Sequence, residues 1–320
     1  MNMSRNHTWL LLPVLILVAG SVFAKQNDVT ECGTVIDKPG KYRVMNDILD
    51  CTPYEDGVLI LTSDVTLDLR GHTISCARDP SVAPVGAVIV GWSVGDVQNV
   101  LIRNGTVIGC DDGILLGFTD GVKVTKMYME DNSDGAITLV GAVNSEIRNN
   151  TFMFNGAGIR SFWGSENRIK GNSVSFAGSA IELNNEVDAI VKCNTVEQSF
   201  YGISAGPYST GNTLQGNLIT DGFLGIMLYG VEHSPIPPDD PVIDPVASGN
   251  LVKHNMALGN FTDLQETTFV VAVGDAYVRP GATCQNAWMN NQFGSELGPS
   301  DCIGFSVELD EDDVCALDDD

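Results

Sequence analysis

The feature that most constrains the fold is an internal repeat of 22 to 23 residues in the middle of the chain. A small residue opens a short apolar step, often of the Gly-Ile-x-Leu kind, at Gly57, Gly86, Gly113, Gly135, Gly158, Ala180, Gly202 and Gly225. A second apolar series keeps the same central period through Leu69, Ile102, Val124, Ile147, Ile169, Val191, Leu214 and Val252. Two independent series with one period predict a solenoid, in which each unit packs on the next.

The residues within each repeat predict β-strands. Runs of three to five residues alternate between apolar and polar and are separated by Gly, Asn, Asp and Ser, with no 3.6-residue period. Strands stacked about 4.8 Å apart would bury one apolar column. That column is predicted to contain Val58, Ala87, Ile114, Ala136, Ile159, Ile181, Ile203 and Ile226. The predicted fold is all-β, a right-handed parallel β-helix with 22–23 residues per coil; a leucine-rich solenoid is excluded because its Leu-x-x-Leu-x-Leu pattern is absent.

Asparagine recurs three residues after the second apolar series. It occupies the last five of eight such positions, which are Asn150, Asn172, Asn194, Asn217 and Asn255. Stacked asparagine amides hydrogen-bond along a solenoid, and asparagine tolerates the left-handed backbone of turns. We therefore assign these residues a structural role.

Two segments carry a family resemblance. The stretch CGTVIDKPGKY at 32–42 and the stretch VTLDLRGHTI at 65–74 resemble secreted right-handed β-helix proteins of the pectate-lyase-like superfamily. The repeats at 86–257 resemble the carbohydrate-binding and sugar-hydrolase repeats of that superfamily. The resemblance covers roughly residues 32–262 and implies the fold; the superfamily includes polysaccharide lyases, hydrolases, epimerases and periplasmic accessory proteins.

The chain is expected to begin with a secretory signal at residues 1–24. Arg5 precedes an apolar run at 10–20 that is too short for a membrane span, and small residues precede the predicted cleavage after Ala24. An N-terminal cap (25–56), the β-helix (57–262, with a proline-rich loop at 231–248), irregular coils (263–304) and an acidic tail (305–320) follow. We expect a secreted or periplasmic protein, without a membrane span and monomeric.

Export permits disulfides, and all eight cysteines lie after the signal. Eight cysteines allow 105 connectivities, so proximity is the only guide. Proximity groups Cys32 with Cys51, Cys76 with Cys110, and Cys284 with Cys302. It leaves Cys193 and Cys315 without a predicted pairing.

The formal net charge of −24 excludes nucleic acid as an expected partner, because phosphate binding needs a cationic surface. Six of the 17 basic residues nevertheless fall one residue after the second apolar series, at Arg70, Arg103, Arg148, Lys170, Lys192 and Lys253. A polyanion could lie along such a row. The alternative, which we favour, is that long cationic stems cover exposed strand surface.

The outward strip of the repeats holds the candidate site. Arg160 and Glu182 are expected one coil apart, about 5 Å between backbones, as the candidate catalytic pair. Tyr208 is expected in or beside the same strip, together with the candidate substrate-binding residues Phe162, Trp163, Asn184, Tyr201 and Tyr229. Aromatic faces and amides suit a glycan, and an arginine suits a uronate carboxylate. An ordinary surface ion pair is the competing interpretation.

The long loop at 231–248 would border this strip and adds His233 as a candidate acid or base. Its aspartates Asp239, Asp240 and Asp244 suit calcium only weakly, because their spacing matches no EF-hand. No metal site is predicted, since the histidines are few and dispersed.

We therefore predict an exported β-helix that binds or processes an extracellular polysaccharide. The sequence does not decide whether it is an enzyme. If it is, a uronate-polymer lyase fits better than a hydrolase, because an arginine is available and repeated aspartates are absent from the strip. The alternatives are a non-catalytic envelope or surface interaction protein and a periplasmic accessory copper protein.

Overall fold

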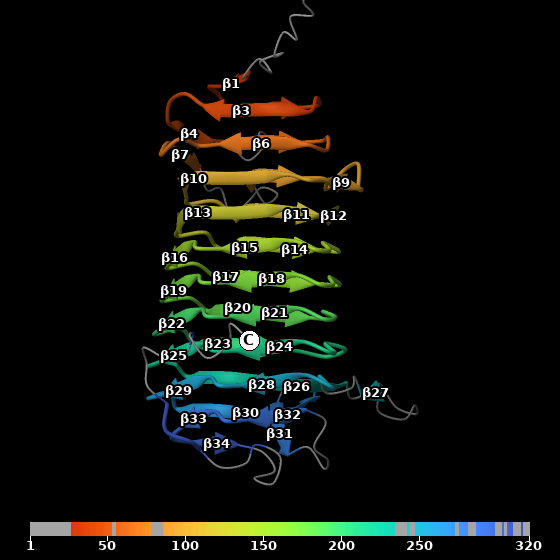
Figure 1. The fold of residues 1–320 in the computed structure, drawn as a ribbon, viewed down its shortest axis with the longest axis vertical. Helices are drawn as coiled ribbons and strands as arrows, with labels where there is room; N and C mark the ends of the chain where they lie inside the picture. The colour runs from red at the N-terminus through yellow and green to blue at the C-terminus, as the bar shows by residue number, and fades with distance from the viewer. Residues whose placement is uncertain are drawn as a thin grey trace, which may run out of the picture.

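The computed structural model describes residues 27–52, 56–77, 86–233, 242–243, 247–272, 275–280, 286–297, 303, 306–309 and 315. Every element with defined bounds in these residues is a β-strand. The strands of successive coils stack along the long axis as a right-handed parallel β-helix (Figure 1). The expected fold is confirmed. The expected signal at 1–24 lies outside the described residues, as does most of the acidic tail.

Each central coil has three strands, and each strand lies on one face of the solenoid. The first face contains β15 (Glu146–Arg148), β18 (Arg168–Lys170), β21 (Ile190–Lys192), β24 (Thr213–Gln215) and β28 (Leu251–Lys253). The second face contains β16 (Thr151–Met153), β19 (Ser173–Ser175), β22 (Thr195–Glu197) and β25 (Leu218–Thr220). The third face contains β11 (Asp112–Gly117), β14 (Gly135–Val140), β17 (Ala157–Phe162), β20 (Ser179–Asn184), β23 (Tyr201–Ala205) and β26 (Leu224–His233). In the earlier coils β10 (Leu101–Ile108) and β13 (Lys123–Glu130) run across the first and second faces without a break.

In two coils, the residue in the buried column of the third face lies one position later in the sequence than expected. Its members are Val58, Val88, Ile114, Ile137, Ile159, Ile181, Ile203 and Ile226. The expectation of Ala87 and Ala136 was therefore wrong in those coils, where Val88 and Ile137 are the members of the column. Leu69 was also wrongly placed, because Leu67 is the residue that pairs with Ile102.

The position just before this column explains the shift. It requires a small residue because a Cβ on Gly158, for example, would lie 2.6 Å from the carbonyl oxygen of Ala180 in the next coil. Only glycine and alanine occur in this row, which reads Gly57, Ala87, Gly113, Ala136, Gly158, Ala180, Gly202 and Gly225, and its three alanines are fully buried. Choosing Gly86 and Gly135 in place of the alanines produced the error.

A ladder of buried asparagines joins the coils at the turn between the first two faces, as expected. The backbone N–H and the Nδ2 of Asn172 both donate to Oδ1 of Asn194, each at 3.0 Å. Nδ2 of Asn172 also donates to the carbonyl of Ile147 at 2.9 Å. The same contacts run from Asn150 to Asn255 and continue to Asn291.

A second ladder, not foreseen, stands before the first face and contains Asn167, Asn212, Asn250 and Asn286. Ala189 interrupts it, and the carboxylate of Glu186 takes the place of the missing amide. Oε1 of Glu186 accepts from Asn167 Nδ2 at 2.7 Å, and Oε2 accepts from the Ser161 hydroxyl at 2.6 Å. Burial raises the pKa of the Glu186 carboxyl, although these hydrogen bonds oppose the rise.

Three disulfides join described cysteines. Cys32 is bonded to Cys51 and Cys76 to Cys110, the pairs that proximity indicates. Cys193 is bonded to Cys315 across 122 residues, which ties the end of the chain back to a central coil. Cys284 and Cys302 lie outside the described residues.

The ladder predicts a large stability effect from one amide. Asn194→Ala removes the acceptor of two buried Asn172 donors, the backbone N–H and the side-chain amide. Each unsatisfied buried group costs about 1–3 kcal/mol, so the free energy of unfolding should fall by at least about 2 kcal/mol in urea titrations. Thr195→Ala, an exposed change on the adjacent residue, should alter it by no more than about 0.5 kcal/mol. Equal changes in the free energy of unfolding for the two substitutions would contradict a stabilising role of the asparagine ladder.

Candidate functional site

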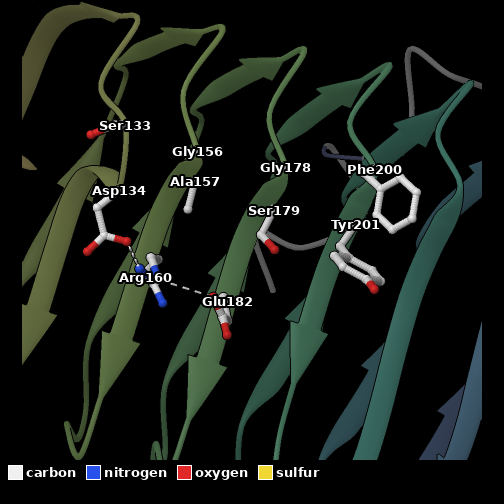
Figure 2. Close-up of a pocket in the computed structure, with 10 residues that line it drawn as sticks. All are labelled: Ser133, Asp134, Gly156, Ala157, Arg160, Gly178, Ser179, Glu182, Phe200 and Tyr201. Carbon is white, nitrogen blue, oxygen red and sulfur yellow. Dashed lines mark hydrogen bonds and ion pairs between the residues drawn. The ribbon is translucent and has the colours of Figure 1, made fainter. Parts of the chain in front are cut away.

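A groove of about 350 Å³ crosses four coils at the start of the third-face strands. Figure 2 shows its lining, with Arg160 between two carboxylates on one side and two aromatic rings at one end. The residues that line it are Ser133, Asp134, Gly156, Ala157, Arg160, Gly178, Ser179, Glu182, Phe200 and Tyr201.

Small residues form the floor of the groove. A Cβ on Gly178 would lie 2.6 Å from the carbonyl oxygen of Gly156, and one on Gly156 would meet the carbonyl of Ser133. Neither position therefore accepts a side chain without a backbone shift. Ala157 and Ser179 follow these glycines and are register partners on β17 and β20. The groove stays open above these residues because the close approach of the coils leaves no room for larger side chains.

One side of the groove is a row of charges. Arg160 and Glu182 are register partners on adjacent coils, as expected, and Nε of Arg160 lies 3.2 Å from Oε2 of Glu182. The guanidinium also contacts the carboxylate of Asp134 through Nη1. Arg160 is 25% exposed and Glu182 19% exposed, so this pair is half-buried. Arginine is thus held between two carboxylates before any ligand arrives.

The row continues away from the groove through hydrogen bonds. Asn184 donates through Nδ2 to Oε1 of Glu182 at 2.7 Å, and Tyr229 donates through its hydroxyl to Oδ1 of Asn184 at 3.4 Å. The Phe162 ring lies under the guanidinium of Arg160, 5.0 Å from its central carbon. Burial raises the pKa of Tyr229 to about 12, with Glu182 and Tyr201 adding to the rise. Tyr229 is therefore a neutral donor and no base.

Two aspartates that the sequence analysis missed surround the same arginine. Asp134 contacts Arg160 directly, and Asp112 accepts a hydrogen bond from the Thr138 hydroxyl at 2.5 Å. Burial raises the pKa of Asp112 to about 6, the charge of Asp134 adds to the rise, and Thr138 and Arg160 oppose it. Asp112 is the first residue of β11, and Asp134 immediately precedes β14 in the next coil.

The aromatic end of the groove is the first ring of a stack. Phe200, Phe223 and Phe261 occupy one turn position in three successive coils, with centroids 4.7 and 5.1 Å apart and planes within 10°. Gly178 and Gly156 hold the same position in the two coils before Phe200. The face of Phe200 that Phe223 does not cover is therefore turned to the open space above Gly178 (Figure 2). Tyr201 meets this ring edge-on at 4.7 Å.

The remaining expected site residues do not line the groove. The Trp163 ring is 64% exposed and lies 6.0 Å from Phe162, and Tyr208 is exposed in the turn after β23. His233 ends β26, but its side chain lies outside the described part of the chain. The loop aspartates Asp239, Asp240 and Asp244 also fall outside it. The structure thus brings together Arg160, Glu182, Phe162, Asn184 and Tyr229, and sets Tyr201 across the groove.

A match to a known protein family shows to which family this chain belongs. Residues 72–237, just over half of the chain, match the family described as periplasmic copper-binding protein (NosD). The chain belongs to this family. Membership and the disulfides agree with the expected location, and the protein is secreted or periplasmic. None of the described residues forms a helix long and apolar enough to cross a bilayer. No curated protein matches the chain by sequence.

Solved structures confirm the parallel β-helix fold. An alginate lyase from Paenibacillus sp. str. FPU-7 is 13% identical with a TM-score of 0.50, over 85% of this chain and 95% of the lyase. A mutant of the periplasmic alginate epimerase AlgG is 13% identical with a TM-score of 0.55, over 84% and 65% of the two chains. The tailspike of E. coli bacteriophage HK620, in complex with a pentasaccharide, is 12% identical with a TM-score of 0.53, over 81% and 55%. At these identities the likeness establishes the fold alone.

The family description names copper, which raises the question whether this chain has side chains that can bind it. Copper sites use imidazole, thiolate and thioether ligands. Nδ1 of His72 lies 3.3 Å from Asp47, a ring nitrogen of His254 lies 3.2 Å from Asn290, and the described cysteines form disulfides. In the described ranges no three His, Cys, Asp or Glu side chains gather as a metal site. These residues do not fit a copper centre.

Asp112 predicts a pH dependence of stability. The folded state binds its proton more tightly than the unfolded chain, whose aspartate pKa is about 3.9. The stability that Asp112 contributes is therefore full below pH ~4 and is lost as the pH rises through about 6. Asp112→Asn cannot titrate and should gain on the natural protein over that window when thermal midpoints are measured from pH 4 to 7.5. A difference in midpoint that stays constant with pH would contradict the shift.

Proposed function

We propose that the protein binds an extracellular polysaccharide in the groove between Asp134 and Phe200, and that the segment bound there is uncharged. The observation that carries the proposal is the combination of an open aromatic face, a floor without side chains and a row of hydrogen-bonding charges. A pyranose presents an apolar C–H face to an aromatic ring and hydroxyls to carboxylates. The lining of the groove offers both partners.

The spacing of the coils supports a sugar subsite above Gly178. The phenylalanine stack repeats every 4.7 to 5.1 Å, and the next position in that stack is the empty one over the glycine. A sugar ring placed there would rest on the free face of Phe200. Its hydroxyls would reach Ser179 and Glu182, which line the same part of the groove.

The local charge favours a neutral ligand over a uronate. Asp112, Asp134 and Glu182 surround one guanidinium, and Asp111 lies close by, with its carboxylate 2.5 Å from the Ser133 hydroxyl. A uronate carboxylate would have to displace one of the two carboxylates that already hold Arg160, and would meet the repulsion of the rest. Sugar hydroxyls donate to those same oxygens without that cost.

β-Elimination on a uronate polymer, the finer sequence-based hypothesis, has less support. The mechanism needs a base beside the uronate, whereas Arg160 is ion-paired and the pKa of Tyr229 is raised to about 12. A non-catalytic role, as a glycan-binding platform of the cell envelope, fits the groove as well as an enzyme does. The two are separated by looking for unsaturated products, through their absorbance, with alginate and pectin, and for new reducing ends with neutral polysaccharides.

The proposal is tested by affinity electrophoresis and calorimetry of the mature protein with a panel of glucans, mannans and galactans. At least one neutral polymer should bind. Phe200→Ala should weaken that binding about tenfold, because it removes the stacking face. Glu182→Gln should weaken it as well, by replacing a charged acceptor with a neutral amide.

Phe261→Ala is the matched control. It deletes the same side chain from the other end of the same exposed stack, and binding should be unchanged. Equal losses in Phe200→Ala and Phe261→Ala would contradict the assigned subsite. Failure of every neutral polymer to bind, or formation of unsaturated products from alginate or pectin, would contradict the proposed function.

A further inference from the structure

The outward side chains of β17 and β20 continue beyond the groove along the third face. Figure 2 shows the two strands running away from the groove through Arg160 and Glu182. The next outward register pair is Phe162 and Asn184. The Phe162 ring contacts the guanidinium of Arg160, 5.0 Å away, and the ring of Trp163, with 6.0 Å between centroids. Polar and aromatic side chains therefore line a path from the groove to the end of β17.

Trp163, at the end of this path, occupies a turn position that does not favour tryptophan. Its φ of 56° lies in the left-handed region, which bulky residues rarely adopt. The neighbouring coils have Gly141 and Asn185 there, and both residue types take that backbone readily. Phe118 shares the position in an earlier coil, where its ring lies 6.3 Å from that of Trp92. Burial does not compensate for the strain at Trp163, because its side chain is 64% exposed, and such strain is typical of functional sites.

Hydrogen-bonding groups accompany the aromatic rings along the path. Oε1 of Glu182 accepts a hydrogen bond from Asn184, and Oε2 accepts one from Arg160. A carboxylate can accept about four hydrogen bonds, so Glu182 keeps acceptor positions for sugar hydroxyls. A Cβ on Gly206 would lie 3.0 Å from the hydroxyl oxygen of Tyr229, so the glycine leaves room for the tyrosine beside Asn184. Asn184 and Tyr229 thus border the path with an amide and a hydroxyl.

The same outward row provides no comparable path along the axis. On either side of the Arg160–Glu182 pair, the register partners are Thr138 and Ser204. These residues are only 5% and 4% exposed, and Met227 in the following coil is 6% exposed. A ligand that follows this row along the axis would leave the accessible side chains after one coil. The accessible groups continue along the strands instead.

We propose that the glycan chain bound in the groove continues across the third face, parallel to β17 and β20, and that Trp163 stacks on a sugar ring at its other end. This inference rests on the proposed function, because the near end of the same chain lies on Phe200. The strand rises about 20 Å from Ala157 to Trp163, a distance that several pyranose rings are needed to span. The ligand is therefore a linear neutral polysaccharide that crosses the solenoid between coils, with its axis along the strands (Figure 1).

A second exposed tryptophan serves as the matched control. Trp92 is 49% exposed and follows β8 (Gly86–Val90), at the same edge of the third face as Trp163. The outward register partners beside it, Ile89 on β8 and Leu115 on β11, have no hydrogen-bonding side chains. An exposed indole is present there without the polar path that leads to Trp163. Glycan binding should therefore not depend on Trp92.

The test is calorimetry of the mature protein with oligosaccharides of increasing length, from the disaccharide upward, prepared from the neutral polymer that binds best. Affinity should rise with length until the chain reaches Trp163. Trp163→Asn should weaken binding of the long oligosaccharides about fivefold and leave the disaccharide unchanged, because the short ligand occupies the Phe200 subsite. Asparagine is chosen because Asn185 holds this position in the next coil, so the thermal midpoint should not fall. Trp163→Tyr keeps an aromatic face and should retain most of the affinity.

Fluorescence gives a second readout of the same contact. In a Trp92→Phe variant, Trp163 is the one exposed tryptophan left among the described residues, since Trp288 is 8% exposed. A long oligosaccharide should protect its emission from quenching by acrylamide, and the disaccharide should not. Trp92→Asn, the same substitution as at Trp163, should leave the affinity for every length unchanged.

Three results would overturn the extended path: equal losses in Trp163→Asn and Trp92→Asn, an affinity that does not depend on length, or quenching that a long oligosaccharide leaves unchanged. The groove and the path can fail separately. If Phe200→Ala weakens binding at all lengths and Trp163→Asn at none, the groove stands and the path is wrong. If no neutral glycan binds at all, both proposals are wrong.

Discussion

The stacking of coils in strict register is the constraint on which the rest of the molecule depends. Two groups enforce it: the buried asparagines, whose amides bridge each turn to the next, and the glycine or alanine row that lets neighbouring backbones meet. A side chain larger than alanine in that row would meet a carbonyl oxygen. Because the register is fixed, residues 22 or 23 apart in sequence become neighbours about 4.8 Å apart. Surface residues that act together in this protein therefore form rows along the axis of the solenoid.

Two faces of the solenoid show this principle with different residues. On the third face, carboxylates enclose Arg160 and leave an acidic groove with one open aromatic face. On the first face, basic residues repeat over successive coils. A rigid solenoid can present both at once because its faces are separated by turns and a packed aliphatic interior.

The sequence predicts the architecture well because the repeat is a property of the chain alone. Period-two runs, the asparagine row and the Arg160–Glu182 neighbours follow from counting residues. The register of Gly86 and Gly135 was mistaken because alanine serves as well as glycine at the tight position. Asp112 and Asp134 were missed because they differ by one position: Asp112 opens β11 and is the register partner of Gly135, whereas Asp134 lies just before β14. The Phe200, Phe223 and Phe261 series was visible in its spacing of 23 and 38 residues, the spacing of the coils themselves. The Cys193–Cys315 bond joins segments 122 residues apart, and no local pattern indicates it.

The most direct test of the account is a crystal structure of the protein with an oligosaccharide of the neutral polymer that it binds best. The account predicts a sugar ring over Gly178, stacked on the free face of Phe200, with hydroxyls within hydrogen-bonding distance of Glu182 or Asp134. Density for the sugar on any other face, at a concentration that saturates binding in solution, would contradict it.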